Sequence, residues 1–117
     1  MNVERAVREC ALASSAGNYA RTIELCEAAI RANPRSAESF TALGKAHYEL
    51  GNNREAVQFL EGALRINSRD RTALVLLGTA RQDMGNIAGA REAYERYLRL
   101  YPDGSRSNEI RSILESL

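Results

Sequence analysis

The sequence predicts an all-α solenoid of antiparallel helix pairs, and three observations lead to this prediction. The doublet Gly-Asn recurs at residues 17, 51 and 85, so the chain repeats itself every 34 residues. Eighteen alanines, two prolines and no tryptophan among 117 residues favour helix throughout. Within each repeat, apolar and small residues recur three or four positions apart, which is the period of a helix with one buried face.

Turn signals divide each repeat into two helices. Gly51 ends one helical pattern as a C-cap glycine does, and a polar turn follows it. The short connections place neighbouring helices antiparallel. The expected helices cover residues 3–15, 19–32, 37–50, 53–66, 71–84, 87–100 and 106–116.

Gly44 and Gly78 lie in the middle of expected helices, where glycine costs about 1 kcal/mol relative to alanine. We therefore expect the partner helix to approach closely at both positions. The helices should bury one continuous core, made of Leu43, Ala46, Ala56, Leu60, Ala63, Leu64, Leu77, Ala80, Ala90, Tyr94 and Leu98.

The repeats share a motif of fixed spacing. It reads Phe40-x-x-Leu43-Gly44-x-x-His47 with Ala56-x-x-x-Leu60, and then Leu74-x-x-Leu77-Gly78-x-x-Arg81 with Ala90-x-x-x-Tyr94 and Pro102. This pattern resembles the tetratricopeptide repeat (TPR) family over residues 3–104. The resemblance implies one domain, 1–117, wound as a right-handed superhelix. Its parts are the repeats 3–36, 37–70 and 71–104 and a capping helix, 105–117.

The first repeat departs most from this pattern. Glu9 stands where leucine is expected, and Thr22 where alanine is expected. Cys10 and Cys26 fall at small core positions, one on each helix of the pair. Their spacing matches no redox or zinc motif, and no secretory signal is visible, so we expect two buried, reduced thiols. A disulfide is the alternative, because facing helices can bring the two residues together.

Composition and motifs argue against catalysis. His47 is the single histidine, so no histidine cluster can bind a metal, and we expect it to pack in a helix interface. The chain has neither a glycine-rich phosphate loop nor a G-x-S-x-G motif. The net charge of +1 argues against nucleic acid, and no run of apolar residues reaches the ~20 of a membrane span. We expect no enzyme, no metal, no cofactor and no membrane insertion.

The remaining candidate site is the concave groove, which the first helix of each TPR pair lines. The residues expected to bind a partner at its centre are Thr41, Lys45, Tyr48, Glu49, Val75, Thr79 and Gln82. Tyr48 is the expected anchor, since tyrosine is enriched among binding hot spots. TPRs that clamp an acidic C-terminus need basic or amide side chains at matching positions. This chain has Val7, Ala11, Ala42, Thr72 and Leu76 there, so we do not expect that clamp.

The resemblance implies a protein-interaction module that binds a partner's peptide or helix. Fifteen arginines against one lysine indicate a GC-rich bacterial genome, and the missing secretory signal favours the cytoplasm, so we expect a bacterial scaffold or adaptor. The alternative is self-assembly through the repeat ends, where Val3, Val7 and Cys10 would be poorly covered. The groove can also be only the solvated inner wall of a larger array.

Overall fold

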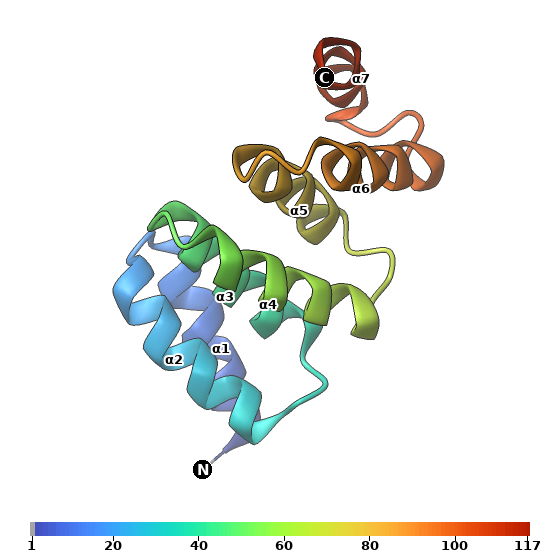
Figure 1. Ribbon diagram of the computed structural model, residues 1–117. Coiled ribbons are helices and arrows are strands. Elements are labelled where there is room, and N and C mark those ends of the chain that lie inside the picture. Colours follow the sequence, from blue (N-terminus) through green and yellow to red (C-terminus); the bar gives the residue numbers. More distant parts are fainter. Residues whose placement is uncertain (1) are drawn as a thin grey trace.

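The computed structural model describes residues 2–117, which form seven α-helices and no strand (Figure 1). The pairs are α1 (Val3–Ser15) with α2 (Tyr19–Ala32), α3 (Ala37–Glu49) with α4 (Asn53–Ile66), and α5 (Arg71–Asp83) with α6 (Ile87–Leu100), followed by α7 (Ser107–Ser116). Every helix lies within one residue of its expected bounds, which confirms the all-α prediction. The pairs stack so that α1 and α7 lie at opposite ends of a body 46 Å long.

The Gly-Asn doublets turn the chain between the two helices of each pair. Their glycines have positive φ: Gly17 at 75°, Gly51 at 83° and Gly85 at 79°. Glycine adopts this left-handed conformation without the strain of a Cβ atom. In two of the doublets the asparagine side chain also caps the next helix: Asn18 accepts a hydrogen bond from the Arg21 backbone N–H at 3.2 Å, and Asn86 accepts one from the Gly89 backbone N–H at 3.0 Å.

The buried apolar side chains form two clusters, so the expectation of one continuous core is wrong. The cluster of α1–α3 is built mostly from small residues: Ala6, Cys10, Cys26, Ala29, Ala42 and Leu43. The cluster of α4–α7 contains larger ones, among them Leu60, Leu64, Leu74, Leu77, Tyr94, Tyr97 and Ile110. The division falls between α3 and α4, inside the second repeat. Of the expected core residues, only Leu98 is not fully buried.

The paired helices approach closely at Gly44 and Gly78, as expected. A Cβ atom at Gly44 would lie 2.7 Å from Leu60 Cγ, and one at Gly78 would lie 2.5 Å from Tyr94 Cε1. Both distances are too short for a real contact, so a large side chain of the second helix fills the space that each glycine leaves.

Cys10 and Cys26 form a disulfide that joins α1 to α2. This contradicts the expectation of reduced thiols, although both residues are fully buried as expected. Each cysteine lies 34 residues before one member of the Gly44–Leu60 contact, so the pair takes the place of that contact in the first repeat. The close approach of the helices there puts the two Cα atoms 4.6 Å apart, within the range that a disulfide spans.

The last helix, α7, covers the end of the α4–α7 cluster. Ile110 is fully buried, and Ile113, Leu114 and Leu117 pack half-buried against the same cluster. The opposite side of α7 is exposed and carries charges such as Arg111 and Glu115. Within residues 2–117, no helix is both long enough and apolar enough to cross a membrane.

Candidate functional site

Three adjoining hollows follow the first helices of the pairs. The N-terminal hollow, of about 450 Å³, lies along α1, and the central hollow, of about 390 Å³, lies between α1, α3 and the start of α5. The C-terminal hollow, of about 210 Å³, lies between α3, α5 and the segment before α7. Ala11 and Glu38 line both of the first two hollows, and Lys45 and Thr72 line both of the last two. The hollows therefore form one continuous surface, the α1–α3–α5 groove.

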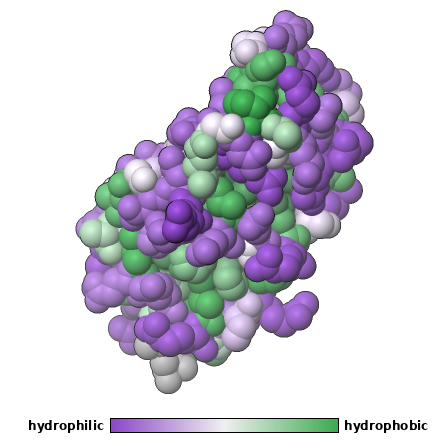
Figure 2. All heavy atoms as spheres, viewed as in Figure 1, coloured by the Kyte–Doolittle hydropathy of each residue, from purple (hydrophilic) through white to green (hydrophobic). Residues whose placement is uncertain are grey.

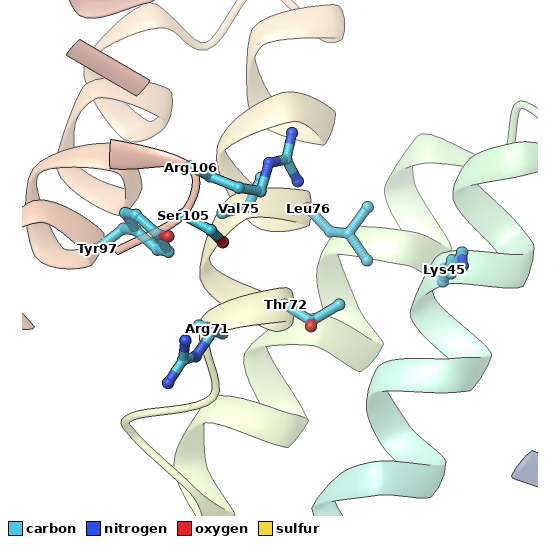
Figure 3. A pocket seen from close by; sticks show the side chains of 8 residues that line it. All are labelled: Lys45, Arg71, Thr72, Val75, Leu76, Tyr97, Ser105 and Arg106. Atoms are coloured by element: carbon cyan, nitrogen blue, oxygen red, sulfur yellow. The ribbon is translucent and has the colours of Figure 1, made fainter. Parts of the chain in front are cut away.

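Three basic side chains surround the C-terminal hollow (Figure 3). Arg106 is held by Glu109, with 2.9 Å between the guanidinium and the carboxylate. The guanidinium carbon of Arg71 lies 4.4 Å from the centre of the Tyr101 ring. Lys45 stands across the hollow from α5 and forms no ion pair with any residue that the structure describes.

The floor between these cations is largely apolar. Val75 and Leu76 of α5 and the buried Tyr97 of α6 line it. Figure 2 shows that hydrophobic residues reach the visible surface of the molecule in patches between polar ones. The C-terminal hollow can therefore hold an apolar group beside an acidic one.

Carboxylate and hydroxyl side chains, among them Glu38, Asp70 and Thr41, line the central hollow. The Thr41 hydroxyl donates a hydrogen bond of 2.7 Å to Asp70, and the same carboxylate accepts a 3.0 Å bond from the Ala73 backbone N–H. Asp70 thus caps α5 and also fixes the side chain of Thr41 on α3. Glu38 is exposed at the rim of the hollow and forms no ion pair within residues 2–117.

Other residues expected in the site take part in hydrogen bonds between helices. The Tyr48 hydroxyl donates to Asp83 at 3.0 Å, and burial, followed by the bond to Asp83, raises the pKa of Tyr48 to about 12. Thr79 and Gln82 both bond to the hydroxyl of Tyr94, at 3.1 and 3.0 Å.

The structure thus divides the seven expected site residues into two groups. Thr41, Lys45 and Val75 line the groove. Tyr48, Thr79 and Gln82 link α3, α5 and α6 through the bonds just described, and Glu49 is exposed at the end of α3. That these residues bind a partner remains a prediction.

Sequence reasoning did not include several lining residues in the site: Arg71, Leu76, Tyr97, Ser105 and Arg106. Ser105 and Arg106 follow the last repeat, so the repeat pattern gives no position for them. The turn signal Asp103-Gly104-Ser105 was the available hint, because a turn there brings the next residues back toward α5.

His47 packs as expected. Its ring stacks on Phe59, with the ring centres 5.4 Å apart and the planes inclined by 13°. Within the described part of the chain, no group of three or more His, Cys, Asp or Glu side chains is placed to hold a metal ion.

Comparison with models of known protein families shows to which family this chain belongs. A family model described as "Tetratricopeptide repeat" matches residues 13–72, and a second with the same description matches residues 72–104. The chain belongs to the tetratricopeptide repeat family. The seven helices fit three TPR pairs and a capping helix, as the sequence motif implied.

Solved structures agree with this TPR fold. MamA matches with a TM-score of 0.89 and 24% identity over 98% of this chain and 67% of its own. The Arabidopsis OM64 TPR domain matches with a TM-score of 0.88 and 20% identity, over 97% of this chain and 94% of its own. The first TPR of Spaghetti (RPAP3), bound to the HSP90 peptide SRMEEVD, matches with a TM-score of 0.86 and 23% identity. The match covers 97% of this chain and 91% of that one. No curated protein gave a significant match.

Proposed function

We propose that this TPR chain is a non-catalytic protein-interaction module that binds an extended peptide or a helix of a partner in the α1–α3–α5 groove. The observation that carries the proposal is the continuity of the three hollows, which share Ala11 and Glu38 at one junction and Lys45 and Thr72 at the other. A surface that runs over the first helices of three successive pairs suits a long ligand. The peptide complex of the RPAP3 TPR, a protein of the same fold, supports this choice.

The groove would bind by pre-organisation. Its walls are helices whose positions are fixed by the two core clusters, so little conformational entropy is lost when a ligand arrives. The unpaired Lys45 beside Val75 and Leu76 favours a partner segment that carries an acidic side chain next to an apolar one.

Selection from a displayed library of random peptides, followed by calorimetry on one selected peptide, tests the proposal. Lys45→Glu should weaken binding about tenfold or more and flatten its salt dependence, because the variant reverses the charge at the rim. Tyr48→Ala should cost about 2 kcal/mol or more of binding free energy if Tyr48 is an anchor. Gln58→Ala, at an exposed position of α4, is the matched control and should leave the affinity unchanged. A library that yields no binder, or a peptide whose affinity ignores Lys45, contradicts the proposed groove, whereas a peptide that ignores only Tyr48 contradicts the expected anchor.

Self-assembly is the second candidate function. Val3 and Leu12 of α1 are exposed to 42% and 63%, which supports an apolar contact at this end of the molecule. Cys10, which was expected to add to that surface, is fully buried in the disulfide, so this part of the expectation is wrong. Light scattering at increasing protein concentration separates the two candidates, since groove binding requires only a monomer.

The excess of arginine over lysine supports a bacterial origin. We propose a role as a scaffold or adaptor in a bacterial assembly, and the cytoplasm as its location. The disulfide is notable for such a location. Cytoplasmic thiols are kept reduced, and the disulfides that do form there are usually transient and catalytic or redox-sensing.

A further inference from the structure

The disulfide occupies a defined place in the repeat. In the second and third pairs, a glycine of the first helix faces a large side chain of the second, at Gly44–Leu60 and Gly78–Tyr94. In the first pair, Cys10 and Cys26 stand at these same two positions. A covalent bond therefore replaces the packing contact that joins the helices in the other pairs.

The bond ties the two helices together at a point of close approach. The Cα atoms of Cys10 and Cys26 are 4.6 Å apart, near the short end of the range for disulfides. Two free thiols need about 3.5–4 Å between their sulfur atoms, as non-bonded heavy atoms do. Reduction therefore removes the covalent tie between α1 and α2 and leaves α1 free to move away.

The fully buried side chains of the first pair are small, and the larger ones packed against them, such as Ile23 and Ile30, are only partly buried. The cluster of α1–α3 consists mostly of alanine and cysteine side chains, whereas leucine and tyrosine fill the cluster of α4–α7. Within the described chain, α1 packs only against α2 and α3. A displacement of α1 is therefore local and leaves α4–α7 in place.

The same helix carries one wall of the groove. Val3, Glu4, Val7 and Ala11 line the N-terminal hollow, and Ala11, Ser14 and Ser15 line the central one. A shift of α1 changes the width of both hollows and leaves the C-terminal hollow, which α1 does not line, unchanged.

We infer that the Cys10–Cys26 bond is a thiol-redox switch that sets the position of α1 and thereby the N-terminal part of the groove. In the reducing direction, a dithiol gives two electrons and two protons to the bond, which becomes two thiols, and the dithiol closes to its own disulfide. In the oxidising direction, a small-molecule disulfide accepts two electrons from the cysteines and leaves as two thiols. Both sulfurs are buried, so the reagents react when the end helix α1 opens locally.

Amide hydrogen exchange of the full chain, free of any ligand, tests the switch. The oxidised protein is compared with protein reduced by dithiothreitol. Exchange in residues 3–32 should become about tenfold faster or more on reduction, while residues 71–100 keep their protection. Oxidised glutathione should restore both the bond, seen by mass spectrometry as the loss of two hydrogen masses, and the slow exchange.

The matched control is the double variant Cys10→Gly with Cys26→Leu, which copies the Gly44–Leu60 contact into the first pair. Its exchange should not respond to dithiothreitol. Cys10→Ser with Cys26→Ser should resemble the reduced protein, and the glycine–leucine variant remains informative if the serine variant fails to fold.

Three results would overturn the inference: equal exchange in the two redox states, equal loss of protection in both halves, or failure of oxidised glutathione to form the bond. Only the consequence for ligand binding rests on the proposed function. The exchange measurement uses no ligand, so it tests the movement of α1 even if the groove binds no peptide. Equally, peptide binding can be tested even if α1 does not move on reduction.

Discussion

The hydroxyl of Tyr48 on α3 donates a hydrogen bond to the carboxylate of Asp83 on α5, with 3.0 Å between the oxygen atoms. The two residues lie near the C-terminal ends of their helices, just before the turns at Gly51 and Gly85. The bond therefore ties the second repeat to the third at the edge of the molecule where the Gly-Asn turns lie.

The first prediction concerns the ionisation of Tyr48, whose pKa is raised from 10.0 to about 12. The folded state favours the neutral phenol, so this contribution to stability is complete below pH 10 and is lost as the pH rises toward 12. Asp83→Asn keeps a hydrogen-bond acceptor but removes the negative charge, and the pKa of Tyr48 should fall. An NMR titration of the Tyr48 ring, assigned with Tyr48→Phe, measures this. An unchanged midpoint would show that Asp83 does not affect the ionisation.

A second prediction concerns the close approach at Gly78. Gly78→Leu places its side chain against the fully buried ring of Tyr94, so it should lower the free energy of unfolding by about 1–3 kcal/mol. Urea denaturation measures the change. Ala88→Leu, at an exposed position of α6, introduces the same side chain and should change the free energy of unfolding by no more than about 0.5 kcal/mol. Equal effects of the two substitutions would mean that α5 and α6 do not meet at Gly78.

Loss of the disulfide should destabilise the first repeat. The double substitution Cys10→Ser with Cys26→Ser removes a crosslink between residues 16 positions apart. Because the unfolded chain then gains loop entropy, the free energy of unfolding should fall by about 3 kcal/mol. Cys10→Gly with Cys26→Leu should lose less, because it restores a packing contact. Denaturation of both variants under non-reducing conditions gives the comparison, and serine substitutions without cost would show that the bond adds no stability.

A fourth prediction concerns the capping helix. Ile110 is fully buried against the α4–α7 cluster, so Ile110→Ala should reduce stability by about 2–5 kcal/mol. Ser112→Ala, on the exposed side of α7, should have an effect below about 0.5 kcal/mol. If the isoleucine variant is as stable as the serine variant, α7 does not contribute to the core.

Helix bounds could be predicted to within one residue because their signals are local. Each Gly-Asn doublet supplies the left-handed turn residue and, in the next position, the N-cap residue of the following helix, and the repeat places this signal three times. The close approach at Gly44 and Gly78 also followed from the sequence, since a mid-helix glycine needs a packing reason.

The disulfide was only the alternative expectation, although the repeat contained its signal. The alignment puts Cys10 at the position of Gly44 and Cys26 at that of Leu60. If the close approach expected at Gly44 is carried into the first repeat, the two cysteines come within bonding distance. The C-terminal hollow is a different case, because Ser105 and Arg106 lie outside the repeat and only tertiary packing brings them to α5.

The unequal clusters bear on how the chain folds during synthesis. The α1–α2 pair leaves the ribosome first, yet most of the large buried side chains belong to α4–α7, which are made last. We expect the folding nucleus to form in this later half, with the first pair docking onto it once α3 has supplied Leu43. Until then both cysteine thiols of the nascent chain remain open to solvent, so the redox conditions that the chain meets while α4–α7 are being made decide whether the first pair docks with its disulfide already formed.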